Sequence, residues 1–275
     1  MNGNQMEQLR LEDRINTFSR FYKEKYGKKI FKIGLSTGLE CPRRLQHNPC
    51  VFCEPHSFID ETAKSFSSIT DQIEYMTGKL TRQYGDIGFI AYFQDNTSTY
   101  GDLDYLVNLF RQADIHPLIQ EIIVSTRPDY LNPEILDIFQ HFSKEVRIEI
   151  GLQTINDKSL RFLNRNHSQQ DNINALALIK EFGLKTGVHL IMGIPGENKN
   201  DIMETIGFLI RNKIDEIKFH HLVVYKNTRL AELYETVNWE CAYHDLNEYC
   251  ELLGEIFPYI SPDTVISRFF TSNLN

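Results

Sequence analysis

Short runs of β-branched and aromatic residues alternate along this chain with segments of helical periodicity. The runs are IFKIGLST (30–37), IGFIAYF (87–93), EIIVST (121–126), VRIEIGL (146–152), KTGVHLIMG (185–193) and DEIKFHHLV (215–223). They are continuous apolar runs more than clean alternations, which is typical of parallel strands covered on both faces. We therefore expect six parallel strands.

Apolar residues three to four positions apart predict helices between these strands. The helices lie at about 68–84, 103–110, 172–182 and 202–210, and Asp102 is a candidate N-cap of the second. One more helix at 13–26 precedes the first strand, and a helix at about 244–257 and a strand at 265–270 come last. Alternating strands and helices predict an α/β fold, a partial (β/α)6 TIM-like barrel.

The expected division is an N-terminal helical extension (1–29), the barrel (30–236) and a C-terminal extension of one helix and one strand (237–275). No Pro/Gly/Ser-rich linker, low-complexity tract or short repeat interrupts the chain. In such barrels the loops at the carboxyl ends of the strands carry the functional site. The loops after each predicted strand are therefore where chemistry is expected.

The composition is that of an ordinary globular protein. Of 275 residues, 24% are charged and 41% are hydrophobic, which excludes disordered and collagen-like classes. Lys and Arg number 29 against 37 Asp and Glu, so the net charge of −8 argues against unaided binding of a polyanion such as tRNA. A local basic patch of Arg43 and Arg44, or of Lys28, Lys29 and Lys32, stays open.

No run of about 18 apolar residues and no signal-peptide pattern occurs, so we expect a cytoplasmic protein without membrane contact. Its five cysteines are an odd number, and three of them lie close together in one loop. In a cytoplasmic chain, clustered cysteines favour metal chemistry over disulfides. Cys241 and Cys250 have no third partner nearby, and we expect them to be packing thiols.

The loop after the first strand spaces Cys41, Cys50 and Cys53 as C-x8-C-x2-C. Three thiolates satisfy three irons of a [4Fe–4S] cluster and leave the fourth iron open to a substrate-like ligand. A Cys3His zinc site with His56 or His47 is the competing hypothesis. Free buried thiols are the third possibility.

Six stretches in order along the chain resemble the radical S-adenosylmethionine (radical SAM) superfamily, and within it the Elp3-like branch and the bacterial YhcC/YtqA group. They are Cys41–Cys53, AYFQDNTSTYG (91–101), STRPDYLNPEIL (125–136), VRIEIGLQTINDKSLRFLNRNH (146–167), HLIMGIPGE (189–197) and IKFHHLVVYKNTRLAELY (217–234). The x8 gap departs from the superfamily's usual C-x3-C-x2-C, although longer first gaps are familiar in the Elp3-like branch. Ser125 stands where that branch often has Glu.

The resemblance implies a binding role for several residues, with the three cysteines holding the cluster. The segment with Phe93, Gln94, Asn96 and Thr97 is expected at the amine of S-adenosylmethionine (SAM), Gln153 at its ribose, Glu149 in support and Arg165 at its carboxylate. Gly193, Pro195 and Gly196 are expected along one side of the adenine, and Phe219, His221 and Leu222 along the other. Arg127 and Asp129 are expected to form a structural ion pair.

An enzyme of this family reductively cleaves SAM, and the resulting 5′-deoxyadenosyl radical abstracts hydrogen from a substrate. The resemblance therefore implies an external one-electron donor such as flavodoxin or ferredoxin. Elp3-like relatives modify tRNA with an acetyltransferase domain, for which we expect no room in this chain, so a small molecule or peptide is an equally open substrate. The alternative is a non-catalytic barrel that binds zinc through Cys41, Cys50, Cys53 and His56.

Overall fold

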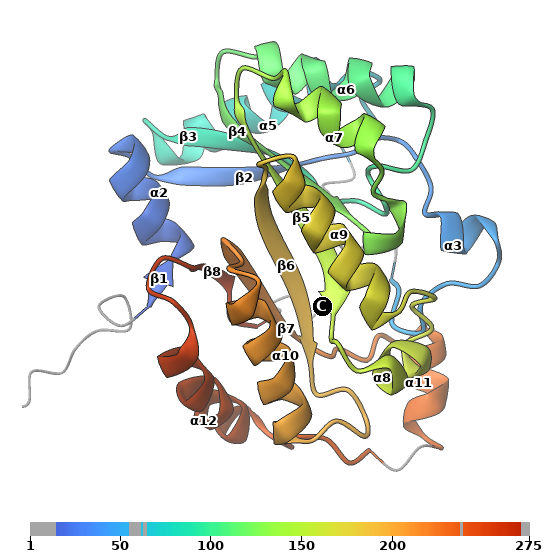
Figure 1. Ribbon diagram of the computed structural model, residues 1–275. Coiled ribbons are helices and arrows are strands. Elements are labelled where there is room, and N and C mark those ends of the chain that lie inside the picture. The colour runs from blue at the N-terminus through green and yellow to red at the C-terminus, as the bar shows by residue number, and fades with distance from the viewer. Residues whose placement is uncertain (1–14, 55–61, 63–64, 237–238, 271–275) are drawn as a thin grey trace, which may run out of the picture.

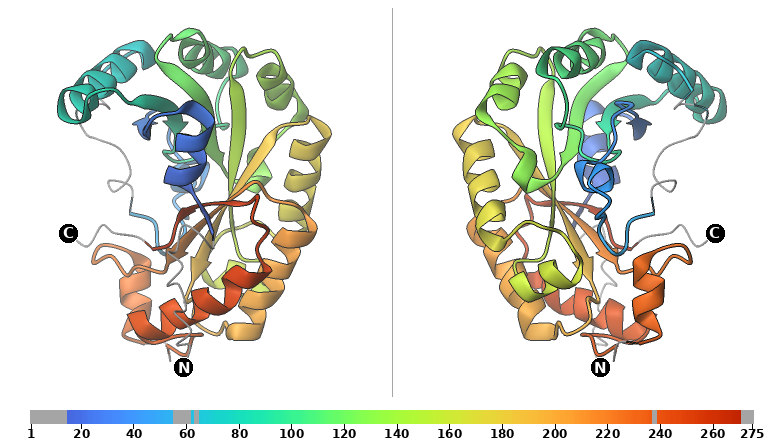
Figure 2. Two further views of the ribbon diagram at one scale, coloured as in Figure 1. Left: turned by 90° about the vertical axis from the view of Figure 1, so that its left-hand side faces the viewer. Right: turned by 90° about the vertical axis from the view of Figure 1, so that its right-hand side faces the viewer.

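The computed structural model describes residues 15–54, 62, 65–236 and 239–270, and one curled parallel sheet forms its centre. Its strands are β1 (Asn16–Thr17), β2 (Ile30–Leu35), β3 (Gly88–Phe93), β4 (Ile119–Thr126), β5 (Glu145–Gln153), β6 (Lys185–Met192), β7 (Glu216–His221) and β8 (Val265–Arg268). They are ordered β1-β8-β7-β6-β5-β4-β3-β2, and every neighbouring pair is parallel. The sheet curls into an open half-barrel with most helices on its outer face (Figures 1 and 2).

The predicted count of six strands in the sheet is too low, because the sheet has eight strands among the described residues. The six predicted strands are present as β2 to β7. The predicted C-terminal strand does not stand apart from the barrel, since β8 pairs with β7 from Glu216↔Val265 onward. β1 has only two residues, which is too short for any periodicity to predict.

The helices lie mostly between consecutive strands, as the alternation predicts. They are α2 (Phe18–Tyr26), α3 (Pro42–Leu45), α5 (Ile69–Tyr84), α6 (Leu103–Ile115), α7 (Pro133–Gln140), α8 (Asp157–Phe162), α9 (Gln169–Glu181), α10 (Lys199–Arg211), α11 (Arg229–Tyr234) and α12 (Leu246–Ile256), with 3-10 turns η1 (Pro128–Tyr130) and η2 (Phe257–Tyr259). Asp102 caps α6 as predicted, because its side chain accepts a hydrogen bond from the amide of Tyr105. The unpredicted α3, α7, α8 and α11 have at most eight residues and therefore little periodicity.

The first helix starts later than predicted. α2 begins at Phe18, because Asn16 and Thr17 pair with β8 and the Thr17 hydroxyl accepts the amide of Arg20. Residues 13 and 14 of the predicted helix lie outside the described part of the chain. A helix cannot continue through residues that supply backbone hydrogen bonds to a strand.

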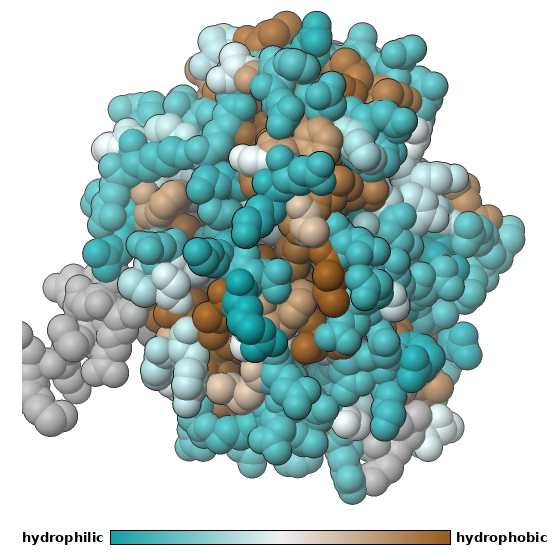
Figure 3. All heavy atoms as spheres, in the orientation of Figure 1, coloured by the Kyte–Doolittle hydropathy of each residue, from teal (hydrophilic) through white to brown (hydrophobic). Residues whose placement is uncertain are grey.

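The main hydrophobic core lies between the outer face of the sheet and the helices. It includes Ile33, Phe93, Ile148 and Phe219, all fully buried. Hydrophilic residues cover most of the outer surface seen in Figure 3, with hydrophobic side chains showing between helices. No helix in the described residues has the length and hydropathy needed to span a bilayer.

The inner face of the half-barrel is unusually polar and is closed at one end by α2. Tyr22 is fully buried there and packs with Ile30, Ile90 and Ile123. Its hydroxyl donates to Glu121 Oε2 at 2.9 Å. Because α2 covers the amino-terminal end of the strands, access to the interior is left to their carboxyl-terminal end, where the loops lie.

Candidate active site

The cysteine loop is held in place by backbone hydrogen bonds to two short helices. Val51 lies between the second and third cysteines of the motif, and its amide donates to the carbonyl of Leu163 at the end of α8 at 3.1 Å. The carbonyl of Val51 accepts the amide of Leu230 in α11 at 2.8 Å. Val51 and Leu230 also pack together in a small apolar cluster with Leu163. The loop is therefore fastened to the rim of the half-barrel.

Each thiol of the motif has a polar neighbour. Arg165 Nη1 lies 3.4 Å from the sulfur of Cys50, and Arg44 Nη1 lies 3.6 Å from that of Cys53. The third sulfur, of Cys41, is 3.7 Å from the hydroxyl of Thr97. Burial raises the pKa of the Cys53 thiol, and the guanidinium of Arg44 opposes this effect by favouring the thiolate.

Among the residues that the structure describes, no three Cys, His, Asp or Glu side chains converge on a point that could hold one metal ion. Thiolates of a [4Fe–4S] cluster each bind a separate iron, so this finding does not bear on a cluster. His56, the fourth ligand of the zinc hypothesis, lies outside the described residues. His47 is exposed and lies two residues after the end of α3.

The three thiols line one pocket of about 300 Å³ at the carboxyl-terminal ends of the strands. That size is at the lower end for small-molecule sites. Seven of the thirteen predicted SAM-binding residues line the same pocket, namely Gln94, Asn96, Thr97, Gln153, Arg165, His221 and Leu222. Six of them lie at the carboxyl ends of three strands, β3, β5 and β7, and Arg165 follows α8. The fold therefore brings together the residues that the sequence motifs placed far apart.

The other predicted residues do not line this pocket. Phe93 and Phe219 point to the outer face, where their rings meet Phe110 and Phe257 edge-on. Glu149 points inward but lies beneath the pocket, in contact with Lys32. Gly193, Pro195 and Gly196 follow β6 outside the lining. The SAM-binding roles of these six residues stay predictions, and none of the six is among the residues that line the pocket.

Gly193 and Gly196 are covered by the chain that precedes α12. The Tyr243 hydroxyl donates to the carbonyl of Met192 at 2.9 Å, and the amide of Gly196 donates to the carbonyl of Glu240 at 2.8 Å. A Cβ on Gly193 would lie 2.6 Å from the Tyr243 oxygen, and the φ of Gly193 is +83°. We expected the adenine of SAM to lie along the chain at this glycine. In the structure, Tyr243 of the same chain makes a close approach there.

This contact makes Gly193 a sensitive position. We expect Gly193→Ala to lower the free energy of unfolding by about 1–3 kcal/mol, because the new Cβ meets Tyr243 and the left-handed backbone disfavours alanine. Urea unfolding followed by circular dichroism measures the change. The matched control is Gly254→Ala, whose Cβ would meet nothing within 4 Å and whose glycine is inside α12. A Gly193→Ala protein as stable as wild type would contradict this explanation.

Beneath the pocket, the buried carboxylate of Glu149 lies close to four hydrogen-bond donors. Glu149 is 1% exposed and accepts from Lys32 Nζ at 3.0 Å, Tyr92 OH at 2.7 Å and His189 Nε2 at 2.7 Å. Lys218 Nζ lies 3.4 Å from the same carboxylate and donates to Tyr92 OH at 2.6 Å. Glu149 is thus the centre of a buried ionic cluster, and its predicted role in support of the SAM site stays a prediction.

The charges of this cluster shift the pKa values of its members. Burial alone would raise the pKa of Glu149, but Lys218 and Lys32 bring it well below its usual range. Burial lowers the pKa of Lys218 to about 7, although Glu149 opposes this. Burial and Lys218 also lower the pKa of His189 to about 4, so the imidazole is neutral at pH 7.

Arg127 lines the pocket with unused hydrogen-bonding capacity. It is 3% exposed, and its Nη2 pairs with Asp129 Oδ2 at 2.8 Å, which confirms the predicted ion pair. Its Nε and Nη1 are buried without a hydrogen-bond partner among the described residues. A buried guanidinium with two free donor nitrogens can accommodate an anion.

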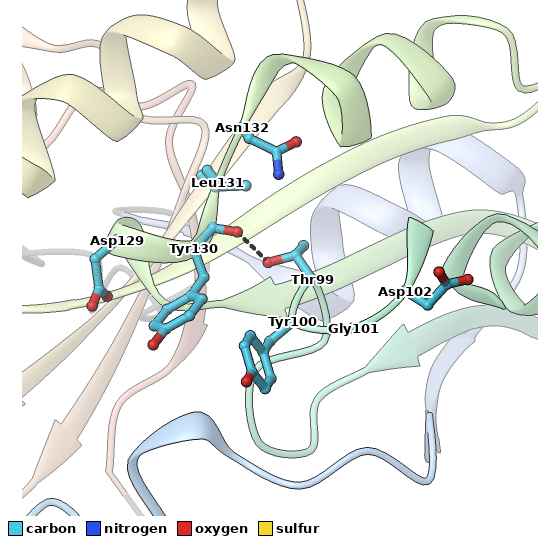
Figure 4. Close-up of a pocket in the computed structure, with 8 residues that line it drawn as sticks. All are labelled: Thr99, Tyr100, Gly101, Asp102, Asp129, Tyr130, Leu131 and Asn132. Atoms are coloured by element: carbon cyan, nitrogen blue, oxygen red, sulfur yellow. Dashed lines mark hydrogen bonds between the residues drawn. The ribbon is translucent and has the colours of Figure 1, made fainter. Parts of the chain in front are cut away.

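A second, more open hollow of about 590 Å³ lies between the segments that follow β3 and β4. Figure 4 shows Tyr100 and Tyr130 side by side, with ring centroids 5.2 Å apart, and Asp129 and Asp102 at opposite ends. The Thr99 hydroxyl donates to the carbonyl of Tyr130 at 2.6 Å. The ion pair between Arg127 and Asp129 separates the two hollows, one of which is lined by cations and the other by carboxylates.

Several pocket residues were not predicted, chiefly Tyr92, His189, Lys218 and Arg268. A signal for some of them was present, because Glu216, Lys218 and His220 alternate along one strand and therefore share a face. Charged residues inside a strand indicate a polar interior. The sequence does not indicate which face of that strand points into the interior of the barrel.

A half-barrel of parallel strands, with a polar interior and three cysteines after its first long strand, defines a class of enzymes that hold a cofactor at the carboxyl ends of the strands. A family model described as the radical SAM superfamily matches residues 35–209, and a second, described as the Radical_SAM C-terminal domain, matches residues 214–273. The chain belongs to the radical SAM superfamily. It is therefore a radical SAM enzyme, and its cofactors are a [4Fe–4S] cluster and SAM.

Individual relatives are similar to almost the whole chain. Protein YhcC of Escherichia coli (strain K12) is 30% identical over 96% of this chain and 85% of its own length. Protein YtqA of Bacillus subtilis (strain 168) is 26% identical over 98% of this chain and 84% of its own. The solved structure of archaeal Elp3 from Methanocaldococcus infernus has a TM-score of 0.65 at 17% identity, and the match covers 89% of this chain but 57% of that one. This last likeness shows the fold.

Proposed function

We propose that Cys41, Cys50 and Cys53 hold the [4Fe–4S] cluster and that SAM binds beside it in the 300 Å³ pocket. The observation that carries the proposal is that all three thiols line a single pocket, two of them next to an arginine. Cationic neighbours favour thiolates, the form that binds iron. Three cysteines leave one iron free for a further ligand.

The polar groups around the thiols suit the methionine end of SAM, which carries an amine and a carboxylate. Gln94, Asn96 and Thr97 lie at the end of β3, where the amine is expected. Arg165 already donates to the carbonyl of Gly151 at 2.9 Å and lies beside Cys50, whereas Arg127 has two buried donor nitrogens to offer. We therefore assign the carboxylate to Arg127 together with Arg165. Gln153 faces the pocket from β5 and is assigned to the ribose.

When bound, the cluster and SAM supply the 5′-deoxyadenosyl radical that abstracts hydrogen from a substrate. The protein's part is to position the reactants and to keep water away. α2 closes the far end of the barrel, and Tyr92, His189 and Lys218 form the inner wall of the pocket. A flavodoxin or ferredoxin type of donor is proposed to deliver the electron. A net charge of −8 favours a small substrate over unaided tRNA.

Anaerobic reconstitution with iron and sulfide tests this function. We expect a brown protein with about four irons per chain, which produces 5′-deoxyadenosine from SAM after reduction with dithionite. A colourless protein with one zinc per chain and no cleavage of SAM would instead support the zinc-binding alternative. Adding candidate substrates and recording which of them raises 5′-deoxyadenosine above the uncoupled level would identify the substrate.

A further inference from the structure

The pocket carries a strong excess of positive charge in a chain whose net charge is negative. Arg44, Arg127, Arg165, Lys218 and Arg268 all line it, whereas no Asp or Glu is among its lining residues in the described part of the chain. Such a concentration of one sign in a cleft raises the local concentration of oppositely charged ligands. The cations fall into two groups at different places in the pocket.

The first group is accounted for by the cofactor. Arg44 and Arg165 lie beside the sulfurs of Cys53 and Cys50, and Arg127 donates to the carbonyl of Arg165. Arg44 and Arg127 are already paired with Glu40 and Asp129, and the proposed cluster and the SAM carboxylate would add negative charge beside all three arginines. The second group is Lys218 and Arg268; Lys218 lies 3.4 Å from Glu149, and the proposed function assigns neither of the two cations a ligand.

Three adjacent strands place the second group in one row. The register pairs His189 with Lys218 between β6 and β7, and Lys218 with Arg268 between β7 and β8. His220, two residues after Lys218, lies on the same face, and its ring stacks on that of His189 with centroids 5.2 Å apart. Arg268 Nη1 lies 3.4 Å from His220 Nδ1. Four nitrogen-bearing side chains therefore share one wall of the pocket.

The carboxylates beneath this wall do not neutralise it. Glu149 is shared by Lys32 and Lys218, and Glu216 is shared by Lys32 and Arg147. Two carboxylates are thus shared among three cations, Lys32, Arg147 and Lys218. Among the described residues, no carboxylate lies within ion-pair distance of Arg268. Burial is the main cause of the low pKa of Lys218, about 7; Glu149 opposes this effect, and the like charges of Lys32 and Arg268 add to it.

We propose that the substrate of this enzyme is a small molecule with a carboxylate or phosphate group, which binds to Lys218 and Arg268 beside His189 and His220. The inference rests on the proposed function, since the cluster and SAM must occupy the cysteine side of the same pocket. A bidentate contact to the guanidinium of Arg268 and a second contact to Lys218 would suit either anion. The 95% burial of Lys218 favours a small ligand over the backbone of a folded nucleic acid.

The test is isothermal titration of the reconstituted protein with inorganic phosphate and with malonate, in the presence and absence of saturating SAM. Malonamide, which has nearly the same shape without the charge, is the matched control ligand. We expect anion binding that persists with SAM and weakens about tenfold or more in Lys218→Met and in Arg268→Gln. Arg211→Gln changes an exposed arginine on α10 and is expected to leave the anion affinity unchanged.

Tighter binding of phosphate than of malonate would point to a phosphorylated substrate, and the reverse order to a carboxylic acid. Competition between phosphate and SAM would overturn the inference, because the two cations would then belong to the cofactor's carboxylate. Equal anion affinity in wild type and in both folded variants would also overturn it. Failure of the proposed function would be seen separately, as a wild-type protein that does not cleave SAM whatever anions it binds.

Discussion

Cys50→Ala is expected to reduce the cleavage of SAM by more than about 100-fold and to lower the iron content well below four per chain. Cys50 is the most buried of the three thiols, at 8% exposure, and Arg165 lies beside its sulfur. Without it only two thiolates remain, too few to hold a [4Fe–4S] cluster with a single open iron. Iron and sulfide analysis after anaerobic reconstitution, followed by quantification of 5′-deoxyadenosine, measures both effects.

The chain offers a matched control for this variant in Cys250→Ala. Cys250 is exposed on α12 and does not line the pocket, so its replacement should leave iron content and SAM cleavage at wild-type values. Circular dichroism should show that both variants fold. A Cys50→Ala protein that binds four irons and cleaves SAM normally would mean that the cluster is held elsewhere.

Glu149→Gln is expected to lower the free energy of unfolding by about 3–5 kcal/mol, the largest effect on stability that we predict. The carboxylate is 1% exposed and is shared by Lys32, Lys218, His189 and Tyr92. An amide supplies no negative charge, so Lys218 would remain buried in the barrel without its counter-ion. Urea unfolding at pH 7 measures the loss. Glu204→Gln, at an exposed position on α10, should change the free energy of unfolding by less than about 0.5 kcal/mol.

The same carboxylate makes stability depend on pH in a defined direction. The pKa of Glu149 is well below its ordinary value in the folded protein, so the unfolded chain takes up this proton first as the pH falls. Its stabilising contribution is complete above the unfolded pKa of about 4.5 and is lost as the pH drops below it. Stability of the Glu149→Gln protein should therefore fall less steeply with acid than that of wild type. Parallel acid-unfolding curves would contradict this account.

Part of the site could be predicted because local sequence carries its signals. The C-x8-C-x2-C loop stands out in the chain by itself, and its position after the first long strand follows from the alternation of strands and helices. Polar residues directly after strands, such as Gln94 and Gln153, were correctly expected at the same end of the sheet. Parallel strands necessarily bring these ends together.

Other features of the predicted site residues depend on the direction in which a side chain faces or on a partner that is distant in the chain. Phe219 lies one residue from Lys218 and His220, yet it packs against the outer helices because successive side chains alternate between the faces of a strand. Gly193 is covered by Tyr243, fifty residues later in the chain. No periodicity near Gly193 could indicate that contact.

By itself, the sequence determined the α/β alternation, the parallel sheet, the three-cysteine loop and the family. These follow from patterns a few residues long, which hydrophobic burial and backbone geometry translate directly into strands, helices and loops. Only the tertiary structure decided that β8 joins the sheet beside β7, that α2 closes the barrel, and that Lys218 and Arg268 meet on one wall of the pocket. Those outcomes depend on charged side chains and on edge strands of the sheet that lie far apart in the chain. They interact only once the sheet has curled.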